Sequence, residues 1–416
     1  MSLTLRWVKE DEFDRVAETR WMAYGNAGSE LARFKEGIRT DQRAGPGDYL
    51  LAETNGQAVG TTTSMSLTMW VRGAAISCQG VAYVGAIKSA RRRGGGADAK
   101  SAGNPGVASA IMAESLRIAR ERQHVISALM PFRASFYEHF GYGLMERQAR
   151  WTLPLCTLPS GDCEGWRLIQ PGDYADLAAA WQSRVEAGQC DIERSSGRWE
   201  SRRIAEQEGM VFIDRPAASV PIRASALMTK QMILDKSVLH VNEWTADSAA
   251  SFKGLLCFLS TLRDQYSSAI ISVPADWPLN RWLREPQLPH RLVEHAVAEA
   301  RMITPLQMRI LDHGRFLQSL RLTAEAKGRC QIAIQETEGH LSHFGLDIAE
   351  GRAFVKAGQG NPDFEILDRH WAAIACGDLS ATQALCCGLA RENTPGTAKL
   401  LDCLAVGPAP FCQEYF

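Results

Sequence analysis

Side chains that can donate or accept a proton cluster in "SFYEHFGYG", residues 135–143. Tyr137 is the best candidate, because a phenol with a pKa near ~10 stays protonated at neutral pH and can give its proton to a leaving group. His139 lies two positions further on, so it would face elsewhere on a helix. Rings closed by glycines also fit a tightly packed helix-to-strand corner, in which Tyr137 is a core side chain.

A second candidate site is "KSARRRGGG", residues 88–96, between an apolar strand and a helix that begins near Gly106. Glycines let backbone N–H groups approach a ligand closely, and a helix N-terminus carries unpaired N–H donors that suit phosphate. Arginine side chains add charge for phosphates outside the turn. The residues fit a pyrophosphate site or, as is common for short arginine runs, a solvated basic turn. The patterns GxxxxGK[ST] and GxGxxG are not matched, which disfavours a nucleoside triphosphate or a dinucleotide.

The composition disfavours several classes of function. A net charge of −1, with 45% hydrophobic and 22% charged residues, is typical of a soluble globular protein and gives no reason to expect a nucleic-acid partner. No run approaches 18 apolar residues and the N-terminal stretch carries early acids, so we expect neither a membrane span nor a secretory signal. The 11 cysteines form no CxxC pair, and nothing completes a metal site around His340 and His343, so no metal is expected. These features predict a cytoplasmic protein with reduced cysteines.

The elements around the candidate residues follow from apolar periodicity and turn signals. Asn55-Gly56 between two apolar runs is a strong hairpin signal. The helix between two strands at 80–130 places "RRRGGG" at its beginning and the ring-rich stretch after the second strand. The elements predicted for the first domain are helices within 9–40 and 107–123, a hairpin over 49–71, and strands over 80–87, 124–130 and 147–155.

Two further boundaries divide the rest of the chain. Residues 158–166 are rich in turn formers, and four prolines follow residue 273. Between them, a helix at 170–188 and a strand–helix–strand series over 237–276 repeat the order of the first domain. Beyond residue 300, strands are expected over 329–336, 352–358 and 364–376, then a helix-like stretch over 381–390. The sequence therefore predicts a mixed α/β (α+β) chain of three domains, 1–158, 165–299 and 300–416.

Taken together, the motifs resemble the GNAT superfamily of acetyl-CoA-dependent acetyltransferases, and more closely the Eis (enhanced intracellular survival) family. The strand, "RRRG", the helix ending "ARERQ" and "SALM" followed by "FYEHFGYG" carry the likeness. It implies a catalytic GNAT domain, then a degenerate GNAT-like domain without the arginine–glycine turn, then a sterol-carrier-protein-like domain. In the last of these, "CGDLSATQALCCGLA" and the final "FCQEYF" match best. A homo-oligomer, in this family a hexamer, is also implied.

The likeness implies roles for individual positions. Val84 and Ala86 match the strand whose backbone groups bind the pantetheine arm of acetyl-CoA. Tyr137 matches the general acid, and Phe416 matches the C-terminal aromatic residue whose free carboxylate is the general base. Family members run directly from the arginine–glycine turn into the helix, whereas "GGADAKSAGNP" intervenes here. The positions matched to pyrophosphate binding, on either side of this insertion, are Arg92, Arg93, Gly94, Gly106 and Val107.

The implied reaction is direct acetyl transfer to an amine-bearing acceptor, a small molecule or a peptide. A protonated amine has no lone pair, so a base must remove its proton. A terminal carboxylate, with a pKa near ~3.5, is ionised at neutral pH and can act through a water. Without the likeness, the residues at 411–416 would indicate a frayed terminus. Residues 21–36 are expected to border the acceptor pocket by their place after the first helix.

Two alternatives remain open from the sequence. Cys78 lies a few residues before the strand matched to acetyl-CoA binding and is the nearest candidate for a covalent acetyl-cysteine route, although no histidine is placed to activate it. The other alternative is a lipid- or hydrophobic-ligand-binding protein led by the third domain, with an inactive GNAT domain. The insertion in the arginine–glycine turn is the main feature in its favour.

Overall fold

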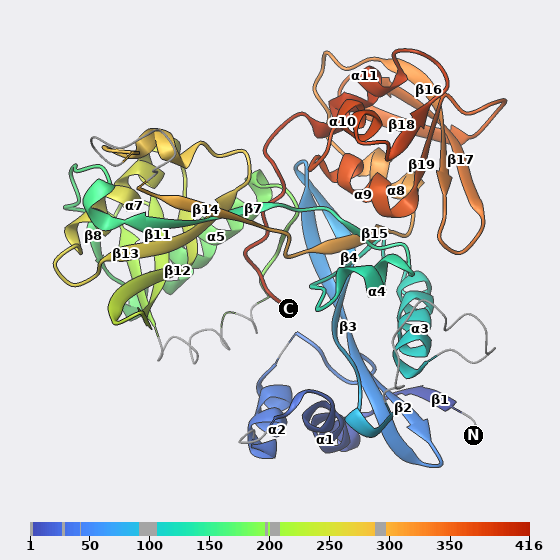
Figure 1. Ribbon diagram of the computed structural model, residues 1–416, viewed down its shortest axis with the longest axis horizontal. Coiled ribbons are helices and arrows are strands. Elements are labelled where there is room, and N and C mark those ends of the chain that lie inside the picture. Colours follow the sequence, from blue (N-terminus) through green and yellow to red (C-terminus); the bar gives the residue numbers. More distant parts are fainter. Residues whose placement is uncertain are drawn as a thin grey trace.

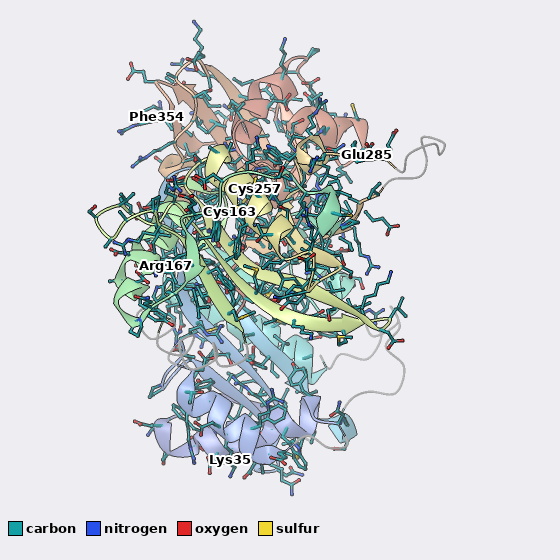
Figure 2. All side chains as sticks on the ribbon, turned by 90° about the vertical axis from the view of Figure 1, so that its left-hand side faces the viewer. Lys35, Cys163, Arg167, Cys257, Glu285 and Phe354 are labelled. Atoms are coloured by element: carbon teal, nitrogen blue, oxygen red, sulfur yellow. The ribbon has the colours of Figure 1, made fainter. Side chains whose placement is uncertain are left out.

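The computed structural model of the chain describes residues 3–26, 30–41, 43–90, 106–195, 199, 209–287 and 297–416. Within this part the strands form three sheets, and each sheet is the centre of one lobe (Figure 1). The first lobe is drawn mainly in blue and cyan, the second in green and yellow, and the third in orange and red. Lys35 of the first lobe and Phe354 of the third lie at opposite ends of the molecule (Figure 2).

Antiparallel hairpins and one parallel pair build the first sheet. Its described strands are β1 (Leu3–Trp7), β2 (Tyr49–Thr54), β3 (Gln57–Val71), β4 (Ala74–Ala86), β5 (Ile126–Leu129), β6 (Gly143–Leu144), β9 (Asp191–Ile192) and β15 (Gln307–Ile310). They lie in the order β1-β2-β3-β4-β5-β15-β6, with β9 paired to β3. Asn55 and Gly56, at φ of 52° and 75°, form the turn between β2 and β3, so the predicted hairpin is confirmed.

Among the described residues, four helices belong to the first lobe. They are α1 (Phe13–Tyr24), α2 (Leu31–Thr40), α3 (Val107–Glu121) and α4 (Ala134–Glu138), with 3-10 turns at Glu10–Glu12 and Lys88–Ala90. The buried face of α3 carries Ile111, Met112 and Leu116, which share a cluster with Leu50 of β2 and Val81 of β4. Burying each such side chain contributes about 1.5–3 kcal/mol, so this face fixes α3 against the strands that precede it.

The second sheet repeats the strand–helix–strand order of the first. Its described strands are β7 (Gln148–Pro154), β8 (Trp166–Leu168), β10 (Met210–Asp214), β11 (Ala224–Ile233), β12 (Lys236–Ala246), β13 (Ser268–Pro274) and β14 (Glu299–Ile303). They lie in the order β14-β7-β13-β12-β11-β10-β8. The elements that pack on it are α5 (Tyr174–Ala187), α7 (Ala249–Thr261) and the 3-10 turns Leu155–Thr157, Pro171–Asp173 and Leu279–Trp282.

The third sheet is the smallest and carries its helices on short connections. Its described strands are β16 (Gly328–Gln335), β17 (Leu341–Ala349), β18 (Arg352–Ala357), β19 (Phe364–Leu367) and β20 (Ala390–Glu392), in the order β18-β17-β16-β19-β20. The helices are α8 (His313–Ser319), α9 (Asp368–Cys376), α10 (Ala381–Cys386) and α11 (Thr397–Leu401), with a 3-10 turn at Asp402–Ala405.

The prediction of one strand over 364–376 is correct only as far as Leu367. The strand β19 ends at Leu367 and the helix α9 begins at Asp368. Residues 371–376 are all buried, so the run shows no polar face, and periodicity cannot separate a buried strand from a buried helix. Gly377, at φ of 84°, ends the helix in the left-handed conformation that glycine adopts most readily.

The first two sheets exchange segments across the predicted domain boundaries. The strand expected to close the first domain, over 147–155, is β7 of the second sheet, where it pairs with β13 and β14. Conversely, β15 follows residue 300 and lies in the first sheet, between β5 and β6. Local propensity predicted both strands, but it carries no information about which sheet each one joins.

Candidate active site

In the first sheet, the parallel strands β4 and β5 are paired over only part of the length of β4, and we call the place where their pairing ends the split. The ladder between β4 and β5 ends at Val81 and Leu129. Tyr83 has a φ of 55°, and the register of β4 with β3 shifts at the same place, so a β-bulge lies just beyond the last pair. A bulge bends its strand and increases the local twist. β5 ends at Leu129, whereas β4 continues through Val84 to Ala86, so this last part of β4 is not paired with β5.

Tyr137 lies beside this split on the short helix α4. Its side chain is 4% exposed and belongs to the same apolar cluster as Val84 and Leu129. The ring of Phe136 meets it edge to face, with centroids 5.0 Å apart. Burial raises the pKa of Tyr137 well above its usual value, so the phenol stays protonated through the neutral and alkaline range. Tyr137 is therefore a core ring whose phenol keeps its proton.

The residues matched to pyrophosphate binding fall in two groups. Arg92, Arg93 and Gly94 lie outside the described residues. Gly106 and Val107 lie at the start of α3, where Gly106 is the N-cap residue and has no side chain to cap the helix. The first turn of α3 carries no acidic residue. Its N–H groups and the positive end of the helix dipole therefore suit an anion.

The C-terminal segment, residues 411–416, runs from the third lobe into the space between the second sheet and the β3–β4 strands (Figure 1). The ring of Phe416 packs over β4, where a methyl group on Gly80 would come within 3.0 Å of it. Arg43 donates a hydrogen bond from Nη1 to the carbonyl oxygen of Tyr415 at 2.8 Å. Asp41 holds Arg43 in place through both carboxylate oxygens, at 2.7 and 2.8 Å. The segment is thus packed and bonded to the first lobe.

A cavity of about 260 Å³ lies next to Phe416. It is lined by Arg43, Ser66, Leu67, Thr68, Ile192, Glu193, Ser195, Glu414 and Phe416. Among the charged residues on this lining, Glu414 pairs with Arg194 at 2.6 Å and Arg43 pairs with Asp41 at 2.7 Å. The described residues within 21–36, which the sequence placed at the acceptor pocket, do not line this cavity. Glu193 and Arg43 were not singled out in the sequence because nothing local distinguishes them from surface charges.

Glu146 is a buried carboxyl group that the sequence analysis missed. It is fully buried, and its Oε1 accepts hydrogen bonds from Nε2 of Gln148 and from the backbone N–H of Cys412, both at 2.6 Å. Within the described part of the chain, its Oε2 has no hydrogen-bond partner. Burial raises the pKa of Glu146 to about 8, so it is largely protonated at neutral pH. The contact with Cys412 ties it to the C-terminal segment.

The raised pKa predicts a pH-dependent stability that a single substitution removes. Between the usual pKa of 4.5 and about 8, the folded protein holds a proton on Glu146 that the unfolded chain has lost. The free energy of unfolding therefore falls as pH rises through this window. One pKa unit corresponds to about 1.36 kcal/mol. We therefore expect the free energy of unfolding of Glu146→Gln, relative to that of the wild type, to increase by roughly 2–4 kcal/mol from pH 5 to pH 8. Urea unfolding at several pH values measures the difference.

Asp173→Asn is the matched control for this measurement. Asp173 is also buried, but hydrogen bonds from Arg167 at 2.7 and 2.8 Å hold the pKa of its carboxyl well below the usual range. It is ionised in both states from pH 5 to 8 and arginine does not titrate there, so the difference between Asp173→Asn and the wild type should be constant. If the difference in free energy of unfolding between Glu146→Gln and the wild type is also constant from pH 5 to 8, the raised pKa of Glu146 is contradicted.

Cys78 does not fit the covalent alternative. Its side chain is fully buried in the apolar core, and burial raises the pKa of the thiol far above its usual value. A thiol is a poor nucleophile, because the thiolate is the reactive form. The described residues also contain no group of three His, Cys, Asp or Glu side chains that could hold a metal ion. None of the described helices is long and apolar enough to cross a membrane.

Known proteins with similar sequences and structures include several that are described as N-acetyltransferases. A family model described as an acetyltransferase (GNAT) domain matches residues 4–145, and a second model of the same description matches residues 191–310. A Streptomyces avermitilis protein described as an uncharacterized N-acetyltransferase is 23% identical over 400 residues, covering 89% of each chain. Several crystal structures match over the full length of both chains. Two of them are a GCN5-related N-acetyltransferase from Anabaena variabilis (15% identity, TM-score 0.82) and Eis1 from Mycobacterium abscessus (16% identity, TM-score 0.78).

Proposed function

Because the chain belongs to the GNAT acetyltransferases, with a GNAT domain in each of its first two lobes, we propose that it transfers the acetyl group of acetyl-CoA directly to an amine. The observation that carries this proposal is the split between β4 and β5, with Tyr137 beside it and Phe416 packed on the same strand. A thioester carbonyl, a leaving thiolate and an attacking amine need an electrophilic contact, an acid and a base. The backbone of β4, Tyr137 on α4 and the C-terminal segment supply candidates for all three.

The split strand and the helix behind it fit acetyl-CoA. The bound thioester supplies an activated acetyl group. Val84 and Ala86 would hold the pantetheine arm through their backbone, and a backbone N–H here would polarise the thioester carbonyl. Gly106 and Val107 would meet the pyrophosphate at the uncapped start of α3. Arg92, Arg93 and Gly94 complete this proposal.

Tyr137 and Phe416 are proposed as acid and base. Burial keeps the Tyr137 phenol protonated, so it can give its proton to the departing thiolate. The carboxylate of Phe416 would accept the proton of the ammonium group, directly or through a water. Glu193 lines the cavity beside Phe416, where Glu414 and Arg43 are each paired with an opposite charge. Glu193 therefore favours a cationic acceptor over an anionic one, which supports amines such as polyamines, aminoglycosides or lysine side chains.

Three finer features are part of the same proposal. The full-length likeness in fold to Eis1 supports an Eis-like enzyme whose third lobe is sterol-carrier-protein-like. A homo-oligomer, hexameric by this likeness, and a cytoplasmic location are proposed with it.

Release of the CoA thiol tests the reaction. With acetyl-CoA and a panel of polyamines, aminoglycosides and lysine peptides, we expect thiol release that requires an amine and saturates with it. Direct transfer predicts initial-rate lines that intersect when both substrates are varied, whereas an acetyl-enzyme predicts parallel lines and a burst. An absence of release across the panel, with no acetyl-CoA binding by calorimetry, would refute the proposed function and favour the lipid-binding alternative.

A further inference from the structure

The second sheet contains a split at the same place as the first. In both sheets a parallel pair of strands flanks a connecting helix, and in the second sheet the ladder of β12 with β13 ends at Val241 and Ile271. A register shift between β11 and β12 adds a bulged residue, Asn242, just beyond the last pair. β12 then runs on to Ala246 and β13 to Pro274. The second lobe has therefore kept the geometry that the first lobe offers to an extended ligand.

The C-terminal segment occupies this second split. The side-chain amide of Gln413 accepts a hydrogen bond from the backbone N–H of Trp244 at 3.0 Å and donates one to the carbonyl oxygen of Trp244 at 2.9 Å. An amide that binds both groups of one residue replaces the neighbouring strand. The ring of Phe411 lies 5.8 Å from that of Trp244 and belongs to the core cluster of the second lobe. Both side chains are nearly fully buried.

The helix behind the second split is unsuited to phosphate. Where Gly106 leaves the start of α3 without a side-chain cap, Ser248 caps α7 and accepts a hydrogen bond from the backbone N–H of Ser251 at 3.2 Å. The carboxylate of Asp247 stands next to this cap and accepts a bond from the Ser251 hydroxyl. A helix start that is capped and carries a carboxylate repels an anion.

From the second split the segment continues towards the first lobe, and each of its last three residues makes a contact. Glu414 is paired with Arg194 at 2.6 Å, and both side chains are buried. The next two residues are the ones already described, Tyr415 bonded to Arg43 and Phe416 over β4. Arg194 also pairs with Glu243 of β12 at 2.7 Å, so Gln413 and Glu414 together hold the segment on the second lobe, three and two positions before Phe416.

We propose that the split of the second lobe is a binding site for the chain's own C-terminal segment, and that Gln413 is a positioning residue that sets where the Phe416 carboxylate lies. This rests on the proposed function, in which that carboxylate is the base. We call the pair of hydrogen bonds between the side-chain amide of Gln413 and the backbone of Trp244 the clamp. These bonds hold the segment as the backbone of a neighbouring strand would.

Gln413→Ala tests the clamp in the full-length protein with two independent readouts. Losing both buried hydrogen bonds should free the segment, so a carboxypeptidase that prefers aromatic residues should release Phe416 about tenfold faster or more from the native protein. We also expect kcat to fall about tenfold while KM for acetyl-CoA stays within about twofold, because the acetyl-CoA site lies in the other split. Gln331→Ala is the control. The side-chain amide of Gln331 also accepts a hydrogen bond from a backbone N–H, that of Gln359 at 3.0 Å, but it lies in the third lobe.

The outcomes separate this inference from the proposed function. Faster release of Phe416 together with lower kcat supports both. Faster release with unchanged kcat supports the clamp and contradicts the carboxylate as base. Release no faster than in Gln331→Ala overturns the inference, whatever the activity. Thermal unfolding of both variants, with transitions that coincide, excludes a general loss of structure as the cause of faster release.

Discussion

Converting the Phe416 carboxylate to a carboxamide lowers kcat by about 10²-fold or more and leaves the Kd for acetyl-CoA within about twofold, if this group is the general base. The carboxamide, made by semisynthesis, keeps the ring that packs over Gly80 and the bond from Arg43 to the carbonyl oxygen of Tyr415. It removes only the charge and the basic oxygen. Steady-state kinetics and calorimetry measure the two effects.

A short extension after Phe416 provides the complementary variant. It keeps a carboxylate on the chain but moves it away from β4, so kcat should fall as far as with the carboxamide. The same residues added before Met1 serve as the control and should leave kcat unchanged. Normal turnover by the carboxamide or by the C-terminal extension would rule out the carboxylate, and Glu193 or Glu414 would then be the next candidates for the base.

Tyr137→Phe is expected to lower kcat by about 10²-fold, with a smaller change in the Kd for acetyl-CoA. The substitution keeps the ring against Val84 and Leu129 and removes the hydroxyl that is proposed to protonate the thiolate. Because burial holds the pKa of Tyr137 well above its usual value, the wild type should keep this proton source on the alkaline side. Stopped-flow measurement of thiol release checks the effect on the chemical step.

Tyr142→Phe is the matched control for Tyr137→Phe. Its hydroxyl is fully buried and bonded to the Ser127 hydroxyl at 2.6 Å, away from the split. Its loss should cost about 1 kcal/mol of stability and little turnover. If the two variants have equal kcat, Tyr137 is a core ring and not the acid. Cys78→Ala should keep wild-type turnover, and its inactivity would instead favour the covalent route.

Local signals predicted most of the elements and failed where long-range pairing decides. The turn at Asn55-Gly56 and the apolar face of α3 carry their own information, and both elements formed as expected. The helix α9 was missed in part because residues 371–376 are buried on all sides. No local pattern distinguishes β7 or β15 from a strand that pairs with its neighbours in sequence.

The candidate site was predictable only in part for the same reason. The rings around Tyr137 and the aromatic end of the chain stand out in the sequence. Their likeness to known acetyltransferases gave them roles that spacing alone could not give. The amide of Gln413 and the backbone of Trp244 are distant in the chain, and the buried Glu146 meets Cys412 only after folding. Such contacts depend on the tertiary fold, which a single sequence does not reveal.

The place of β15 between β5 and β6 has a consequence for synthesis on the ribosome. Domains generally fold as units while the chain emerges, the N-terminal one first. Here β6 pairs with β15, and α4 with Tyr137 lies between β5 and β6. The nascent first lobe must therefore wait for residues 307–310 before this edge of its sheet can close. Until then, the edge of β5 that later pairs with β15 is exposed, and we expect chaperones to bind it.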